Sequence, residues 1–267
     1  MNESVSNPVD NGITGLRIII TGGASGMGAA MVRDFTLHGA KVVSMDINDM
    51  DGQAIVGVAA QAGPGSAYYV HCDVSDEGSV QAAFASAVET LGGLDVLVHA
   101  AGIAPGAPAE TITLSGWEKV FAINARGTFL TNQAAFAYLR DHGGRILNFA
   151  SGAGLNGLPN KAHYAATKGA VLSWTRTVAK EWGRYGITVN SIAPAISTPM
   201  YQKTRSLMTP EVLAAHDARI AADMPIDGKL GDPDRDLAPV LRFMASAGSR
   251  FITGQVISVD GGLSMVR

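Results

Sequence analysis

The chain has 267 residues, of which 47% are hydrophobic and 16% are charged, a balance typical of one large globular domain. Its 20 basic and 23 acidic side chains give a net charge of −3, and the absence of a basic run argues against partners such as nucleic acid or an anionic membrane surface. The longest apolar runs have strand length, well short of the ~20 residues that cross a bilayer, so we expect no membrane-spanning segment.

The N-terminal residues 1–11 are polar and contain neither the basic region nor the apolar core of a secretory signal. We expect residues 1–13 to form a flexible tail and residues 14–267 to form a single catalytic domain. The single cysteine, Cys72, cannot make an intrachain disulfide, and no Cys and His cluster has the spacing of a metal site. These features predict a reduced, cytoplasmic protein without a bound metal.

Short runs rich in β-branched residues alternate along the chain with longer helical patterns. The runs that predict strands are 17–21, 41–46, 67–72, 95–99, 145–149, 188–192 and 255–259. The patterns that predict helices are 27–38, 49–62, 80–91, 117–142 (with room for a break), 164–185 and 233–244. This alternation predicts a single Rossmann-type, doubly wound α/β domain with a seven-stranded parallel sheet and helices on both faces. The ligand of such a sheet lies beyond the carboxyl ends of its strands.

Glycines follow the first predicted strand directly, in the run Thr21-Gly22-Gly23-Ala24-Ser25-Gly26-Met27-Gly28. Where such a run opens a helix, backbone N–H groups and the helix dipole can hold a pyrophosphate; the alternative is an ordinary glycine-rich turn. Asp46 lies eighteen residues beyond Gly28, at the end of the second predicted strand. A carboxylate there accepts hydrogen bonds from ribose hydroxyls and repels a 2′-phosphate, so the sequence predicts NAD rather than NADP.

Tyr164 and Lys168 are four residues apart, at the start of a predicted helix. Side chains at this spacing are neighbours on one helix face, so the ammonium can stabilise a phenolate. A free tyrosine has a pKa of about 10, and a base at neutral pH needs a shift worth about 4 kcal/mol. Ser151, at the end of the fifth predicted strand, can bring a second hydroxyl to the same crevice.

These motifs occur together in the order seen in one enzyme family. The pattern Thr-Gly-x-x-x-Gly-x-Gly at residues 21–28 is followed by Asp46, Asp73-Val74, Asn124, Ser151, Tyr164 and Lys168. Over residues 14–264 the chain therefore resembles the short-chain dehydrogenases/reductases. The resemblance implies that Tyr164 is the general acid/base and that Ser151 stabilises the substrate oxygen. It also implies that Lys168 holds the nicotinamide ribose and lowers the pKa of the tyrosine, and that Asn124 holds a water linking Lys168 to solvent.

The resemblance also implies where the cofactor and the substrate bind. The implied cofactor residues are Thr21, Gly22, Ser25, Gly26, Met27, Gly28, Asp46, Ile47, Asp73, Val74, Ala100, Ala101, Gly102, Tyr164, Lys168, Pro194, Ile196 and Thr198. We expect the insertion at 194–232, which contains a helical pattern at 211–223, to form a lid, and the substrate to contact Ser151, Tyr164, Leu158 and Met200. The lid and residues 152–160 are mostly apolar, with Leu155, Leu207 and Met208 among them, which favours a hydrophobic or alicyclic substrate.

The chain departs from the family pattern at two places. His99-Ala100-Ala101-Gly102 stands where the family commonly has Asn-Asn-Ala-Gly, so the usual asparagine bonds across the sheet cannot all form. Pro194-Ala195 replaces the usual Pro-Gly, and its extra methyl group is expected to narrow the range of φ in the lid. His163 adjoins Tyr164 but points in another direction on a helix, so we expect it at a surface or an interface.

The sequence thus predicts an oxidoreductase that interconverts a secondary alcohol and a ketone with NAD(H). Two alternatives stay open at this point: a 3-oxoacyl-[acyl-carrier-protein] reductase, against which Asp46 argues, and a dinucleotide-sensing protein without catalytic activity. The family resemblance further implies a homotetramer assembled through the helices near 117–142 and 164–185 and through the C-terminal strand.

Overall fold

The structure is a computed structural model in which residues 12–264 are described. Most of the expected N-terminal tail therefore lies outside the described residues. Ile13 does not belong to that tail, because its side chain is fully buried in the hydrophobic core between the sheet and the helices of one face. The folded domain thus begins before residue 14, and the expected boundary was too late.

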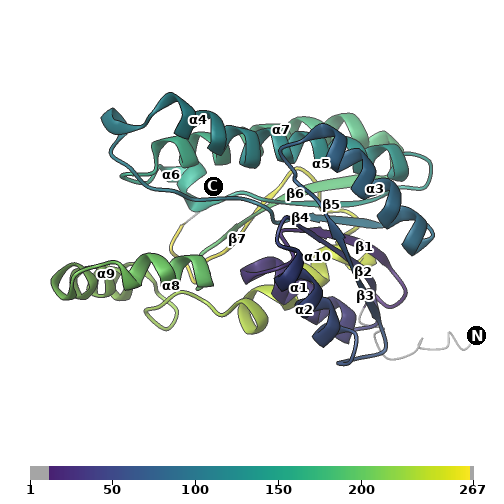
Figure 1. Ribbon diagram of the computed structural model, residues 1–267, viewed down its shortest axis with the longest axis horizontal. Helices are drawn as coiled ribbons and strands as arrows, with labels where there is room; N and C mark the ends of the chain where they lie inside the picture. Colours follow the sequence, from purple (N-terminus) through teal and green to yellow (C-terminus); the bar gives the residue numbers. More distant parts are fainter. Residues whose placement is uncertain (1–11, 265–267) are drawn as a thin grey trace, which may run out of the picture.

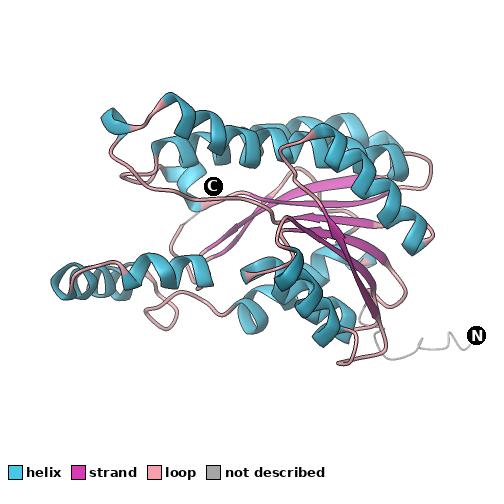
Figure 2. Ribbon diagram, in the orientation of Figure 1, coloured by secondary structure: helices cyan, strands magenta, loops and turns pink. Residues whose placement is uncertain are grey.

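The centre of the molecule is one parallel sheet of seven strands in the order β3-β2-β1-β4-β5-β6-β7 (Figure 2). The strands are β1 (Arg17–Thr21), β2 (Lys41–Asp46), β3 (Ser66–His71), β4 (Val96–His99), β5 (Gly144–Phe149), β6 (Ile187–Pro194) and β7 (Val256–Val259). The fold prediction is confirmed, and each strand lies within two residues of its expected bounds. The strand order reverses between β1 and β4, so the switch point of the sheet lies where the glycine run leaves β1.

Helices cover both faces of the sheet, and each face has its own apolar core. Figure 1 shows one layer above the sheet and one below it. The upper layer contains α3 (Glu77–Leu91), α4 (Leu114–Phe121), α5 (Gly127–Leu139) and α7 (Ala162–Trp182), and the lower layer contains α1 (Gly26–Leu37), α2 (Asp49–Ala59) and α10 (Ala238–Ala245). Alternate residues of β1 pack into the two apolar cores: Ile18 packs on the side of α1 and α10, and Ile19 packs on the side of α3 and α5.

The long helical pattern expected at 117–142 is interrupted by a π-helical turn at Ala122–Arg126. This turn joins α4 to α5 and contains Asn124, whose side chain is 1% exposed. The Thr128 hydroxyl donates to the Asn124 carbonyl at 2.7 Å. In a regular α-helix this carbonyl would accept only from the backbone N–H four residues later. Such π-turns are frequent at functional sites, and this one turns an amide side chain toward the sheet edge.

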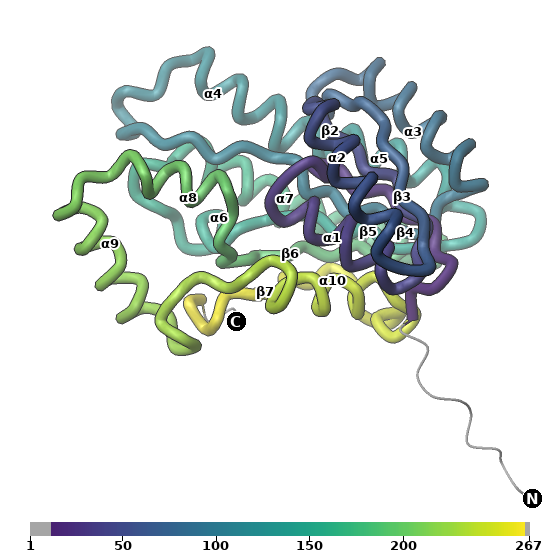
Figure 3. The backbone as a smooth tube through the Cα atoms, turned by 60° about the horizontal axis from the view of Figure 1, so that its bottom comes forward, coloured from purple at the N-terminus to yellow at the C-terminus, as the bar shows by residue number. Residues whose placement is uncertain are grey.

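The expected lid is a pair of helices, α8 (Pro199–Ser206) and α9 (Pro210–Asp223). Each begins with a threonine cap followed by proline, a strong helix-start signal. The two helices are joined by the ion pair between Arg205 and Asp217 and by a 2.8 Å hydrogen bond between Tyr201 and His216. Figure 3 shows α8 and α9 at the same end of the molecule as α4 and the short helix α6 (Gly152–Asn156).

A row of buried polar side chains crosses the sheet just below its carboxyl edge. Thr21, His99, Asn148 and Ser191 are register partners on β1, β4, β5 and β6, and each is at most 2% exposed. Register partners in parallel strands point to the same face. The row therefore forms a polar floor beneath the loops that carry the predicted site.

Candidate active site

Tyr164 and Lys168 lie on one face of the first turns of α7, as their spacing predicts. Lys168 Nζ is 5.7 Å from the centroid of the Tyr164 ring, and it donates a 2.6 Å hydrogen bond to the backbone carbonyl of Phe149. The lysine side chain is 5% exposed, and its burial lowers the pKa of Lys168 to about 8. This ammonium has no carboxylate partner within residues 12–264, so its charge is available to a neighbouring anion.

Burial also acts on Tyr164. It raises the pKa of Tyr164, and the hydroxyl of Ser151 acts in the opposite direction. The family resemblance implies a lowered tyrosine pKa, so burial opposes that implied shift and favours the protonated phenol. A protonated phenol is the form that a general acid requires.

Ser151 lies between β5 and α6, where its hydroxyl caps the short helix. Its Oγ accepts a 3.1 Å hydrogen bond from the Ala153 N–H, which leaves the hydroxyl proton free for another acceptor. Because it influences the pKa of Tyr164, Ser151 is close enough to share a ligand with it. The structure thus brings two hydroxyls from a strand end and a helix start to one point.

Asn124 holds the loop after β4 from the π-turn. Its Oδ1 accepts from the Ile103 N–H at 2.9 Å, and its Nδ2 donates to the Ile103 carbonyl at 2.9 Å and to Thr167 Oγ1 at 3.1 Å. A Cβ at Gly102 would lie 3.2 Å from Asn124 Oδ1 and 3.7 Å from Lys168 Nζ. Asn124 therefore joins three elements around Lys168, namely the β4 loop, the π-turn and α7.

The glycine run after β1 forms a tight backbone cradle. A Cβ at Gly22 would lie 2.7 Å from the Ala101 backbone nitrogen, and a Cβ at Gly28 would lie 2.1 Å from the Gly22 carbonyl oxygen. Gly22 also has a φ of +70°, which favours glycine. The first-turn N–H groups of α1 lack helical partners, and Ser25, its N-cap, makes no side-chain capping bond. These features fit a bound pyrophosphate, as the sequence predicts.

Asp46 is fixed beside this cradle. Its Oδ2 accepts from the Ala24 N–H and its Oδ1 from the Asn48 N–H, both at 3.1 Å. The carboxylate keeps lone pairs for two further donors, as ribose hydroxyls require. Asp73 lies after β3, where hydrogen bonds from the Ser75 hydroxyl and N–H hold the pKa of Asp73 below its usual range.

The remaining predicted cofactor residues lie either at the start of the lid or after the strands β2 and β3. Thr198 lies at the start of the lid, and a Cβ at Gly26 would be 3.6 Å from its side chain, so the lid starts in contact with the glycine cradle. Ala195 and Ile196 are held by backbone bonds to β7 and Gly231. In contrast, the side chain of Val74 is buried in the core and leaves only its backbone available to a ligand near the cradle, whereas the side chain of Ile47 is 64% exposed.

The predicted substrate residues are less closely grouped. Leu158 is 43% exposed and Met200 is 49% exposed; the first lies before α7 and the second lies in α8. Leu207 is 80% exposed and is the C-cap residue of α8. The two predicted substrate residues are therefore accessible apolar side chains on two different segments.

His99, where the family pattern has asparagine, keeps the sheet edge linked in another way. Its Nδ1 lies 2.9 Å from the Thr21 hydroxyl and 3.0 Å from the Thr131 hydroxyl. The Thr21 hydroxyl in turn accepts from the Ala101 N–H at 3.3 Å. Burial, with a smaller contribution from the Lys168 ammonium, lowers the pKa of His99 to about 3, so the ring is neutral at physiological pH.

Three features of the site carried no recognised signal in the sequence. The Phe149 acceptor is a backbone carbonyl, which no residue type reveals. Lys161 makes a hydrogen bond from its Nζ to the Ala104 carbonyl. Its position three residues before Tyr164 is the feature of the sequence that could have indicated a place near the site. His163 was expected at a surface or an interface, but it is 3% exposed, because its face of α7 is packed against neighbouring elements.

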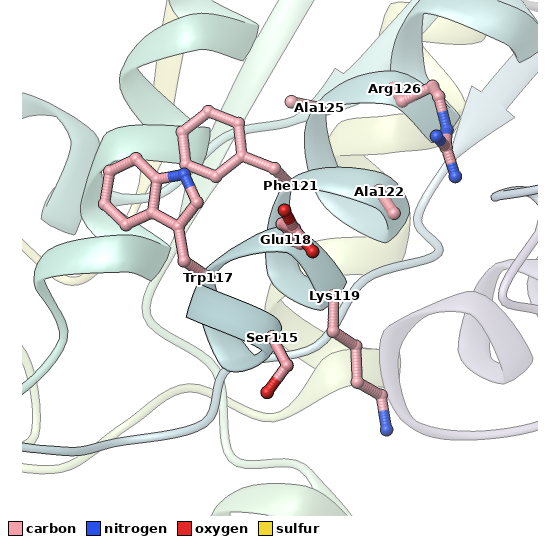
Figure 4. A pocket seen from close by; sticks show the side chains of 8 residues that line it. All are labelled: Ser115, Trp117, Glu118, Lys119, Phe121, Ala122, Ala125 and Arg126. Carbon is pink, nitrogen blue, oxygen red and sulfur yellow. The ribbon is translucent and has the colours of Figure 1, made fainter. Parts of the chain in front are cut away.

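A surface hollow of about 720 Å³ lies over α4 and the π-turn (Figure 4). Trp117 and Phe121 stack beside it with their ring centroids 4.6 Å apart. None of the predicted catalytic residues lines this hollow, so it is a feature of the outer helical face.

Within residues 12–264, no group of three His, Cys, Asp or Glu side chains is placed to hold a metal ion, and no helix there is long and apolar enough to cross a membrane.

Comparison with known proteins places this geometry among dehydrogenases and reductases. A family model described as enoyl-(acyl carrier protein) reductase matches residues 22–264. A 2,5-dichloro-2,5-cyclohexadiene-1,4-diol dehydrogenase of Sphingobium indicum is 37% identical over 96% of this chain and 98% of its own. An inactive 2-(S)-hydroxypropyl-CoM dehydrogenase of Xanthobacter autotrophicus is 39% identical over 88% of this chain and 100% of its own. The crystal structure of a levodione reductase matches with a TM-score of 0.88 at 32% identity, covering 94% of this chain and 98% of that one.

The buried Lys168 ammonium predicts a measurable pH dependence of stability. Burial lowers its pKa from 10.5 to about 8, so the desolvation penalty of the charge is complete below pH 8 and disappears as the pH rises toward 10.5. Lys168→Met removes this penalty at every pH. We therefore expect the free energy of unfolding of the wild type to gain about 3 kcal/mol relative to that of the variant between pH 7 and 10.5.

Urea unfolding of both proteins at a series of pH values measures this difference. Lys180→Met is the matched control, because Lys180 is exposed on the same helix. A wild-type-to-Lys168→Met difference that stays constant across this range would contradict the assignment.

Proposed function

Because the chain belongs to the short-chain dehydrogenase/reductase family of oxidoreductases, we propose that it interconverts a secondary alcohol and a ketone with NAD(H), using Tyr164 as the general acid/base. The observation that carries the proposal is the position of Tyr164, with Lys168 Nζ 5.7 Å from its ring and Ser151 close enough to affect its pKa. The glycine cradle and Asp46 fit the cofactor, whose nicotinamide ring, when bound, accepts or donates the hydride.

The chain's own residues account for the movement of the proton. In ketone reduction, the protonated Tyr164 donates to the carbonyl oxygen as negative charge develops there. The Ser151 hydroxyl donates to the same oxygen and stabilises that charge. In alcohol oxidation, Tyr164 accepts the hydroxyl proton as a phenolate, and the Lys168 ammonium stabilises it. Because Lys168 loses its charge as the pH rises through its pKa of about 8, the tyrosine loses this stabilisation at alkaline pH.

The proposed substrate is an apolar or alicyclic alcohol or ketone. Leu158, before α7, and Met200, in α8, are exposed apolar side chains, and Ala195 adds a methyl group at the start of the lid. Relatives whose names specify a cyclohexadiene diol and levodione as substrates support the same class of compound. An acyl-carrier-protein substrate fits less well, since the carrier is acidic and this chain has a net charge of −3.

We also propose that the protein assembles as a homotetramer through the layer formed by α4, α5 and α7 and through β7. Support comes from the aromatic side chains on this layer: Trp117 on α4 is 39% exposed and Phe129 on α5 is 38% exposed, and Trp117 lines the hollow in Figure 4. Exposed aromatic residues around a shallow hollow are typical of interfaces.

The proposed role of Tyr164 is tested by Tyr164→Phe, which keeps the ring and removes the acid. We expect turnover of a panel of secondary alcohols and ketones, followed by NADH absorbance, to fall by at least about 100-fold. Tyr138→Phe, at an exposed position on α5, should keep full activity. Equal turnover by wild type and Tyr164→Phe would contradict the proposed role of Tyr164, and no turnover by either protein would favour the non-catalytic alternative, which the inactive relative illustrates.

The cofactor assignment predicts a preference for NADH over NADPH that depends on Asp46. A 2′-phosphate about 4 Å from this carboxylate is disfavoured by about 1–4 kcal/mol, so the ratio of the two dissociation constants should be at least about fivefold. Asp46→Ser should reduce that ratio, whereas Asp141→Asn, an equal charge change at a distant exposed position, should not. Fluorescence titration of both cofactors measures this; tighter NADPH binding by the wild type overturns the assignment.

The assembly proposal predicts a solution mass of four 27.6 kDa chains. Light scattering after size exclusion measures it, and Phe129→Arg should lower the mass because it places a charge in the apolar interface. A wild-type protein that elutes as a monomer at micromolar concentration would exclude the tetramer.

A further inference from the structure

Two lysines flank the proposed catalytic tyrosine at the start of α7. Tyr164 and Lys168 share one face of this helix, and Lys161 is the N-cap residue directly before its first turn, with a non-helical φ of −135°. Each ammonium donates to a backbone carbonyl at the carboxyl edge of the sheet: Lys168 to Phe149 at the end of β5, and Lys161 to Ala104 in the loop after β4. Tyr164 is therefore bracketed by two fixed cations, of which the mechanism uses only one.

Lys161 is held against the loop after β4. A Cβ at Gly106 would lie 3.3 Å from Lys161 Cε, so the β4 loop packs against the lysine stem. The Ala107 N–H donates to the Asn160 carbonyl at 2.9 Å, and Asn160 has a φ of +61°. The turn before α7 thus adopts an uncommon backbone conformation that places Lys161 against this loop.

The ammonium of Lys161 is incompletely satisfied by the protein. It has three N–H donors, and only the bond to Ala104 involves another of residues 12–264. No carboxylate in that range lies within 4 Å of it. The residue is half-buried, and burial lowers the pKa of Lys161. A partly desolvated cation of this kind gains most from an acceptor that a ligand brings.

We propose that Lys161 is a second polar anchor of the substrate pocket, which donates a hydrogen bond to an oxygen of the substrate remote from the reacting carbon. The proposal rests on the proposed function, since it assumes that Tyr164 reacts with an alcohol or a ketone. It narrows the substrate class to alicyclic ketones and alcohols with a second oxygen function, such as diones and hydroxyketones.

A purely structural role makes a different prediction from an anchoring role. If Lys161 only fixes the β4 loop, its loss lowers activity toward every substrate to the same degree. If it binds the substrate, its loss affects only substrates that carry the second oxygen. The ratio of kcat/KM for a matched pair of ketones separates the two roles.

The test uses cyclohexane-1,4-dione and cyclohexanone as the pair, with NADH. We expect the wild type to prefer the dione by about ten- to hundredfold in kcat/KM, the contribution of one charge-assisted hydrogen bond. Lys161→Met, which keeps the apolar stem, should abolish most of this preference while changing cyclohexanone turnover less than about threefold. Lys180→Met, an exposed lysine on the same helix, should behave as the wild type, and thermal unfolding with NADH titration checks that both variants fold and bind the cofactor.

Each outcome decides between the claims. Equal loss of both ketones in Lys161→Met, or a wild type without preference for the dione, overturns the anchor but leaves the proposed function intact. A wild type that reduces neither these ketones nor any member of the alcohol and ketone panel overturns the proposed function, and the anchor with it.

Discussion

The hydrogen bond from Lys168 to the Phe149 carbonyl is the interaction on which the site depends. It places a buried ammonium at the end of β5, beside the ring of Tyr164, and so connects α7 to the sheet edge. Asn124 adds a second connection, because its amide joins the π-turn to the β4 loop and to Thr167 on α7. The distances around Tyr164 are thereby set by the ends of β4 and β5, which are among the most buried parts of the chain.

The polar floor beneath this site explains how the sheet edge tolerates unusual residues. His99 replaces an asparagine of the family pattern, yet its ring still reaches hydroxyls on β1 and α5. In the neighbouring strand, Asn148 and Asn132 exchange reciprocal amide hydrogen bonds at 2.8 and 2.9 Å. Buried polar groups are stabilised by pairing, and the partners of His99 and Asn148 include Thr131 and Asn132 on α5 above the floor. Rigidity near the cofactor therefore does not require the usual asparagine.

The parts of the structure that could be predicted are those with a local signal. Buried parallel strands are continuous apolar runs, so their bounds were accessible from the sequence, as were the glycine cradle and the spacing of Tyr164 and Lys168. Helix α8 was not predicted, because its sequence is polar and follows a proline-rich turn, and α6 is too short to show a period. The partners of Lys168 and Lys161 are carbonyls distant in the sequence, and only tertiary packing brings them together. The direction of the Tyr164 pKa shift has the same origin, since burial is a property of the whole fold.

The π-turn at Ala122–Arg126 has a consequence for how the molecule can vary. A π-turn contains one residue more than an α-helical turn, and one residue corresponds to about 100° of rotation about the helix axis. The phase of α4 relative to α5 is therefore set by this single extra residue. The same residue count turns Asn124 inward and directs Trp117 and Phe121 to the outer face. A one-residue deletion in this turn would rotate the aromatic side chains and, at the same time, turn the Asn124 amide away from the β4 loop. Sequence changes in this turn therefore alter the outer face and the proposed reaction centre together.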